Sequence, residues 1–336
     1  MPRQQLARPM PRCVLIETMA EKAKTVTKGQ WTSLSVLLLL CFLLAIGAMR
    51  SDLFPASSAN STPQMEMEAL PFALLTVIAA SFAAAHRATW PRGKQLGPPI
   101  LMALALFVAP SVIVHFALDW VSAFTRVVLF SLVPVFAVVF EPHLGRSSAS
   151  QSRGGLLAAL VSLIGMLCVF PVETPASIQA GCAFAVVIVA AAGVAAANCY
   201  AVRLASESSQ QTIIPMAAIA SAAAALGLIA SGAVTDGFPT HLSMDGQDLA
   251  WSLIVALPGL LLLFWLMPRL TAVRMTSRFV LAPLIAILIG MAIDRPAVGP
   301  RIWLGLLLVV GGAAWLLFAR DDQPTANSST FNLNGD

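Results

Sequence analysis

Apolar residues along this chain come in long blocks that short polar segments separate, without the strict alternation that amphipathic strands show. Each block approaches the roughly 20 residues that a helix needs to cross about 30 Å of hydrocarbon. Ten such blocks span residues 32–49, 70–86, 98–118, 121–141, 154–172, 177–203, 212–234, 249–267, 270–292 and 302–319. Because lipid offers no partners to backbone groups, the pattern predicts an all-α membrane protein with ten transmembrane helices.

Composition strengthens this interpretation. Of the 336 residues, 58% are hydrophobic and only 11% are charged, whereas soluble proteins carry about 25% charged residues. Residues 1–30 are basic, and we expect a cytoplasmic tail there rather than the charged region of a signal peptide. Residues 321–336 are polar, and we expect a disordered cytoplasmic tail.

The distribution of positive charge sets an orientation. If the N-terminus is inside, most of the 20 lysines and arginines lie on the inner side, whereas Arg50, Arg295 and Arg301 are the ones that fall in outer loops. This bias follows the positive-inside rule and predicts that both termini are cytoplasmic. The excess of positive charge is therefore explained by membrane topology, and we expect no nucleic-acid partner.

One proline-containing segment occurs twice in the sequence, in two related copies. Residues 122–140 read SAFTRVVLFSLVPVFAVVF, and residues 271–289 read TAVRMTSRFVLAPLIAILI. When Pro134 is aligned with Pro283, Phe130 falls on Phe279. A related apolar block follows each copy, so the chain divides into two five-helix repeats at residues 31–172 and 176–320. Since five is odd, the second repeat enters the membrane in the opposite sense, and this inverted topology is typical of secondary transporters.

The two prolines are expected to bend their helices. Each one removes a backbone hydrogen bond, and a bend near mid-membrane can free a carbonyl and shape a cavity. We therefore expect Pro134 and Pro283 to line a substrate pathway. A bend that serves only helix packing is the alternative that the sequence leaves open.

These segments carry a family resemblance. Residues 117–139 (ALDWVSAFTRVVLFSLVPVFAVV), 266–288 (LMPRLTAVRMTSRFVLAPLIAIL) and 292–318 (AIDRPAVGPRIWLGLLLVVGGAAWLLF) resemble motifs of the drug/metabolite transporter superfamily, in its bacterial EamA-type ten-helix branch. The resemblance covers roughly residues 31–320. It implies a multi-pass protein of the plasma membrane (the inner membrane of a bacterium) that exports or exchanges a small metabolite or drug.

Three arginines fall inside apolar blocks, where a charge costs at least about 2.5–3.5 kcal/mol. Arg126 either reaches back to the outer interface, toward Asp119, or faces the pathway. Arg274, near the inner end of its helix, either extends to the interface or faces the pathway. Arg278 lies roughly 12 Å along the helix, and no acidic residue in these apolar cores is an obvious partner. If Arg278 faces a central cavity, the cargo is expected to carry a carboxylate or a phosphate.

Other polar side chains within the apolar blocks are few. His115 could exchange a proton near neutral pH, or it could donate a hydrogen bond to a neighbouring carbonyl. Asn198 and Tyr200 could contact substrate, or they could join neighbouring helices. All three are candidate pathway residues, and both interpretations stay open for each.

Several function classes lack their sequence signatures. There is no phosphate-binding Gly-Lys-Ser/Thr motif and no catalytic cluster, so we expect neither an ATP-driven pump nor an enzyme. The scattered histidines and cysteines predict no metal site and no cofactor. A structural or sensory membrane protein is the main alternative to a transporter. Expected partners are the bilayer and a small anionic or zwitterionic substrate, with a second copy of the chain left open.

Overall fold

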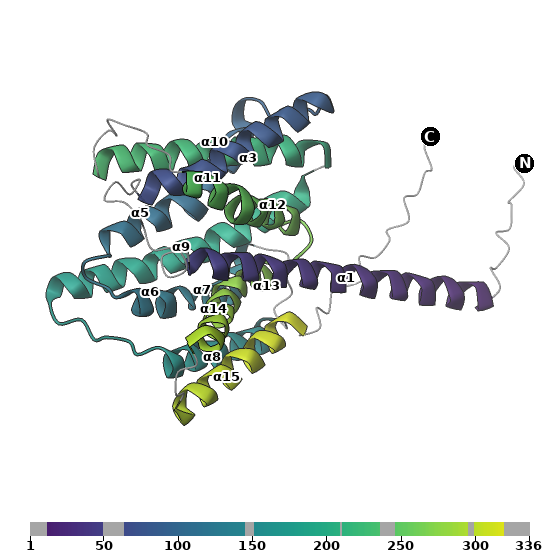
Figure 1. Ribbon diagram of the computed structural model, residues 1–336. Coiled ribbons are helices and arrows are strands. Elements are labelled where there is room, and N and C mark those ends of the chain that lie inside the picture. The colour runs from purple at the N-terminus through teal and green to yellow at the C-terminus, as the bar shows by residue number, and fades with distance from the viewer. Residues whose placement is uncertain are drawn as a thin grey trace, which may run out of the picture.

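The apolar blocks form helices in a computed structural model of the protein (Figure 1), which describes residues 12–49, 64–144, 151–208, 210–235, 246–294 and 299–318. No strand occurs among these residues. The α-helices are α1 (Arg12–Ala48), α3 (Gln64–Ala85), α4 (Gly97–Ala103), α5 (Ala109–Phe116), α6 (Ala123–Phe130), α7 (Val133–Leu144), α8 (Gln151–Val169), α9 (Ile178–Glu207), α10 (Gln210–Thr235), α11 (Gly246–Trp251), α12 (Leu257–Leu266), α13 (Ala272–Thr276), α14 (Arg278–Asp294) and α15 (Pro300–Phe318).

Within the described residues, nine helical stretches are long and apolar enough to cross a membrane. The remaining apolar block, expected at 154–172, forms a shorter apolar helix over Gly154–Val169. The chain is therefore a polytopic helical membrane protein. The helix α1 already begins at Arg12, so a large part of the tail expected at residues 1–30 is helical. The first turns of α1 extend beyond the other helices (Figure 1). The expected tail at 321–336 lies outside the described residues.

Two of the membrane-spanning stretches contain a π-helical turn followed by a proline. The π-helix η2 (Leu104–Val108) joins α4 to α5, and the π-helix η3 (Ser252–Ala256) joins α11 to α12. Pro110 and Pro258 are the second residues of the helices that follow. A proline cannot donate to the carbonyl four residues earlier, and a wider turn accommodates that loss.

The stretches that carry the repeated segment are each broken in two. The first break separates α6 from α7 at Ser131 and Leu132, directly before Pro134, and the second separates α13 from α14 at Ser277. The second break does not lie at Pro283, because α14 continues through that residue, and the bend expected at Pro283 stays a prediction. The Ser277 hydroxyl instead donates to the Arg274 carbonyl at 2.7 Å and competes with the helical hydrogen-bond ladder at that point.

Helix packing places these breaks near the middle of the bundle. The helices α3 and α10 pair at one end, and α8 and α15 pair at the opposite end (Figure 1). Between these pairs, α1 contacts α14, α9 contacts α7, and α13 contacts α7. The principal apolar core includes buried residues from α1, α9, α13 and α14, among them Leu37, Val194, Met275 and Val280.

Candidate functional site

The candidate site centres on Arg278, whose side chain is only 5% exposed. The residue begins α14, directly after the break at Ser277. Its Nη1 donates to the Met275 carbonyl at 2.9 Å, and its Nη2 donates to Asn198 Oδ1 at 2.9 Å. The guanidinium carbon also lies 4.7 Å from the centroid of the Phe279 ring. The structure therefore places the Arg278 side chain inside the helix bundle.

Asn198 comes from α9 and is 1% exposed. Its Nδ2 donates to the Val194 carbonyl at 2.7 Å, and this bond orients the amide so that Oδ1 faces the guanidinium. The amide is neutral, so it satisfies one donor of Arg278 without compensating its charge. Among the described residues, no acidic side chain forms an ion pair with Arg278. The described residues thus leave the buried positive charge of Arg278 without a compensating negative charge.

Two phenylalanines lie beside this charge. Phe130, at the end of α6, and Phe279, in α14, stack with ring centroids 6.3 Å apart and planes 20° apart. Pro134 and Pro283 each follow one of them by four residues, so neither proline can donate to the corresponding phenylalanine carbonyl. Pro134 is buried and Pro283 is half-buried. The sequence alignment paired these residues by position, and the structure brings the two rings into contact.

Arg126 lies on α6 and is half-buried. Its Nη1 atom is buried and has no hydrogen-bond partner in the described part of the chain. Arg126 does not form the ion pair with Asp119 that the sequence left open. This end of the guanidinium is therefore enclosed by the protein although the side chain as a whole is half-buried.

The other three candidate residues lie on α5, α9 and α13. His115 lines a cavity of about 220 Å³ between α3 and α5, whose other lining residues are Met65, Glu68, Pro110, Ser111, Val114 and Leu118. Tyr200 is half-buried and packs against the main core. Arg274 is half-buried on α13, and its backbone N–H lies 3.5 Å from Thr271 Oγ1, the side chain that caps this helix.

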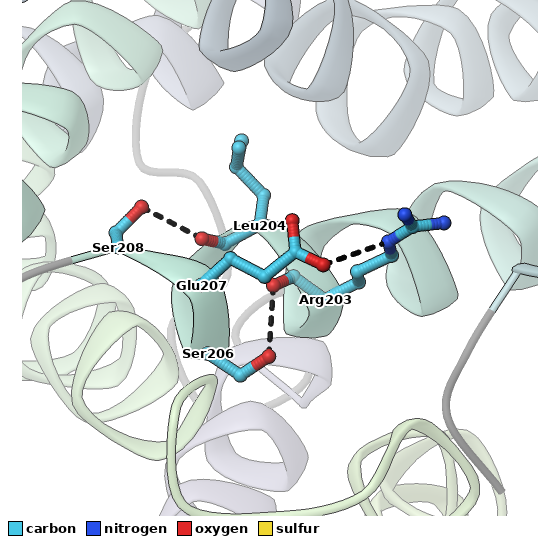
Figure 2. A network of polar contacts seen from close by, with 5 residues as sticks. All are labelled: Arg203, Leu204, Ser206, Glu207 and Ser208. Carbon is cyan, nitrogen blue, oxygen red and sulfur yellow. Dashed lines mark hydrogen bonds and ion pairs between the residues drawn. The ribbon is translucent and has the colours of Figure 1, made fainter. Parts of the chain in front are cut away.

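The end of α9 carries an exposed polar network (Figure 2). Arg203 Nε contacts Glu207 Oε1 at 3.1 Å, Ser206 donates to the Arg203 carbonyl, and Ser208 donates to the Leu204 carbonyl at 2.7 Å. An exposed ion pair of this kind adds little stability. A small apolar cavity of about 30 Å³ next to it is lined by residues that include Leu204, Ser208 and Met216.

Some features of the site have no clear signal in the sequence. The Phe130–Phe279 contact joins residues far apart in the chain. The π-helical turns had a readable signal in the prolines at 110 and 258, which occupy corresponding positions in the third and eighth apolar blocks. No group of three metal-ligating side chains occurs in the described segments.

Comparison with known proteins supports the fold without adding an activity. No family model and no curated protein sequence matches the chain. A crystal structure described only as that of a protein is similar, with a TM-score of 0.66 and 16% sequence identity. The match covers 86% of this chain and 99% of that one. This protein therefore shares its arrangement of helices with almost the whole of that other protein. At 16% identity, the similarity shows the fold alone.

Proposed function

We propose that this protein is a secondary transporter of a small metabolite or drug, built from two inverted five-helix repeats and related to the EamA-type branch of the drug/metabolite transporters. The ten helices cross the plasma membrane (the inner membrane of a bacterium) with both termini inside. The protein exports or exchanges its cargo by alternating access around a central site that includes Arg278, and it performs no chemical reaction on it.

The contact between Phe130 and Phe279 carries this proposal. These residues occupy equivalent positions in the two copies of the repeated segment, and their rings lie 6.3 Å apart. Under two-fold symmetry, a residue meets its own equivalent only close to the axis. In transporters of inverted topology, the axis between the repeats passes near the substrate site at mid-membrane. The stacked rings therefore mark where a central site would lie.

Helix packing supports the same symmetry. Numbered as spans, α3 and α10 are the second and seventh, and α8 and α15 are the fifth and tenth, so each pair joins equivalent spans. The contact of α1 with α14 has its counterpart in the contact of α9 with α7. The π-helical turns η2 and η3 occupy the third and eighth spans. Two halves of similar construction can exchange conformations, which exposes one site to each side in turn.

The charge of Arg278 supports an anionic or zwitterionic cargo. The guanidinium is held by two neutral oxygens, those of Asn198 and Met275, and it has further N–H donors. A carboxylate or phosphate of the cargo would compensate the charge through charge-assisted hydrogen bonds.

Counterflow in proteoliposomes tests the transport function. The purified protein is first screened for thermal stabilisation by amino acids, organic acids, phosphorylated metabolites and cationic drugs. Liposomes loaded with each stabilising compound should then accumulate the same compound in labelled form. We expect Arg278→Gln to lower the initial rate at least about tenfold, since a charge-assisted hydrogen bond contributes about 1.5–3 kcal/mol.

The matched control is Arg203→Gln, because Arg203 is an exposed arginine paired with Glu207 at the end of α9. Its rate should stay within about twofold of the wild type. Stabilising compounds that show no counterflow above protein-free liposomes would contradict transport. Counterflow that Arg278→Gln leaves unchanged would remove Arg278 from the pathway.

A further inference from the structure

Each ring of the stacked phenylalanine pair has an arginine close to it in the chain. The guanidinium carbon of Arg278 lies 4.7 Å from the Phe279 ring centroid. Arg126 precedes Phe130 by four residues in α6, so these two side chains project from one face of that helix. The order Arg126, Phe130, Phe279, Arg278 therefore forms a row that crosses from one copy of the repeated segment to the other.

Both charges in this row lack an acidic partner. Within the described segments, neither Arg126 nor Arg278 forms an ion pair, and Nη1 of Arg126 is buried without any hydrogen bond. Arg278 donates to two neutral oxygens, which leaves its charge uncompensated. Unpaired charges within a membrane protein are expensive and usually mark a substrate pathway. Two of them beside the proposed axis would be compensated by one ligand with two negative groups.

We propose that Arg126 and Arg278 are the two ends of one binding site for a small organic dianion, with a carboxylate or phosphate at each end and its carbon body against Phe130 and Phe279. The inference deepens the proposed function by naming the class of cargo. Arg126 is about one helical turn, roughly 5–6 Å, from Phe130 along α6, Phe130 stacks on Phe279, and Phe279 lies beside Arg278. Because two aromatic residues connect the arginines in this series, the proposed ligand carries its two anionic groups several bonds apart.

The arrangement also explains why the two arginines need not be equivalent by sequence. Arg126 does not align with Arg274 or Arg278 when the prolines of the two repeats are superimposed. Each half contributes an arginine from a different position, so the site is asymmetric although the scaffold is repeated. Asn198 adds a neutral amide at the Arg278 end, whereas Nη1 of Arg126 has no hydrogen-bond partner among the described residues. The ligand is therefore expected to bind in one direction when its two ends differ.

The test compares dicarboxylates with monocarboxylates of the same length on the purified full-length protein. Succinate, glutarate and adipate are titrated beside butyrate, valerate and hexanoate, and the apparent affinity is taken from the dependence of the melting temperature on ligand concentration. We expect at least one dicarboxylate to bind about tenfold or more tightly than its monocarboxylate partner. Putrescine, which carries two positive charges, should give no shift.

Variants then test whether Arg126 binds the second carboxylate of the ligand. Arg126→Gln should lower the affinity for the best dicarboxylate to that of its monocarboxylate partner, and it should leave monocarboxylate binding unchanged. Arg126→Lys should retain part of the advantage, because it keeps the charge but loses the planar fork of donors. The control is Arg269→Gln, since Arg269 is an exposed arginine that stacks on Trp265 at 3.9 Å. It should bind both ligands as the wild type does.

Equal affinity of wild-type protein for dicarboxylates and monocarboxylates would overturn the dianion site, and this comparison needs no variant to fold. An unchanged dicarboxylate advantage in Arg126→Gln would overturn it as well. Ligand binding is measured without a membrane, so the experiments can contradict the transport function and the dianion site independently of each other. Tight dicarboxylate binding without counterflow would contradict transport alone, whereas counterflow of a cationic or neutral compound without dicarboxylate binding would contradict the dianion alone.

Discussion

Asn198→Leu is expected to lower the free energy of unfolding by about 3 kcal/mol. The amide oxygen of Asn198 accepts from Arg278 Nη2 at 2.9 Å, and both side chains are buried. Removing one partner of a buried charged interaction leaves the other charge without its acceptor, which typically costs about 3–5 kcal/mol when both partners are charged. Because the amide of Asn198 is neutral, we expect a cost at the lower end of that range. The measurement is the melting temperature of the protein in detergent, followed by its tryptophan fluorescence.

Two companion variants separate this mechanism from a simple packing defect. Arg278→Met removes the charge itself, so Asn198→Leu should cost much less in that background, and the double variant should be more stable than Asn198→Leu alone. Asn198→Asp keeps the shape of the side chain and places a carboxylate beside the guanidinium. We expect it to retain stability but to abolish anion binding, because the charge of Arg278 is then compensated internally. Additive costs in the double variant would contradict this mechanism.

Gly312→Ala is expected to destabilise the packing of α8 against α15 by about 2–3 kcal/mol. A Cβ at position 312 would overlap Ser162 Oγ and would lie 2.7 Å from both the Ala158 carbonyl oxygen and the Ser162 amide nitrogen. Two of these contacts are with backbone atoms, which cannot rotate away, so the helices must separate. Overpacking of this kind typically costs about 1–3 kcal/mol. The helix pair relies on small residues for close approach, as membrane helices commonly do.

The neighbouring glycine supplies the control. A Cβ on Gly311 would meet no atom within 4 Å, and this residue is exposed on the outer face of α15. Gly311→Ala should therefore be neutral or slightly stabilising, because alanine favours helix by up to about 1 kcal/mol relative to glycine. Both variants are compared with the wild type by melting temperature in the same detergent. A Gly312→Ala protein as stable as Gly311→Ala would show that α8 and α15 do not approach closely.

The sequence by itself was sufficient for the helical membrane class. Each apolar block satisfies its own backbone hydrogen bonds, so length and composition suffice to predict a span without knowledge of its neighbours. Nine blocks meet that criterion in the described residues, and the block at 154–172 forms a helix that ends at Val169. Ser122 and Thr271 were aligned as equivalent positions, and both are the N-cap residues of their helices. Local rules, which depend on residues a few positions apart, were therefore readable.

Breaks within the helices were only partly readable. At each break a serine hydroxyl donates to the carbonyl three residues earlier, Ser131 to Val128 and Ser277 to Arg274. The first break also lies close to Pro134, as proline chemistry predicts, whereas the second lies six residues before Pro283. Serine side chains in membrane helices commonly donate to carbonyls without breaking the helix. Ser162, for example, donates to the Ala158 carbonyl inside the uninterrupted α8. The packing around Ser277 therefore decides the outcome.

Tertiary structure alone decided the environment of the charged residues. The sequence placed Arg126 and Arg278 within apolar blocks, but it could not choose between a side chain that reaches the interface and one that points inward. Arg278 meets Asn198 across 80 residues of sequence, and Phe279 meets Phe130 across two different helices. Such contacts depend on how helices rotate about their own axes and pack, and hydrophobicity hardly constrains that rotation in a helix that is apolar on every face. The spans were thus a property of the sequence, and the site is a property of their packing.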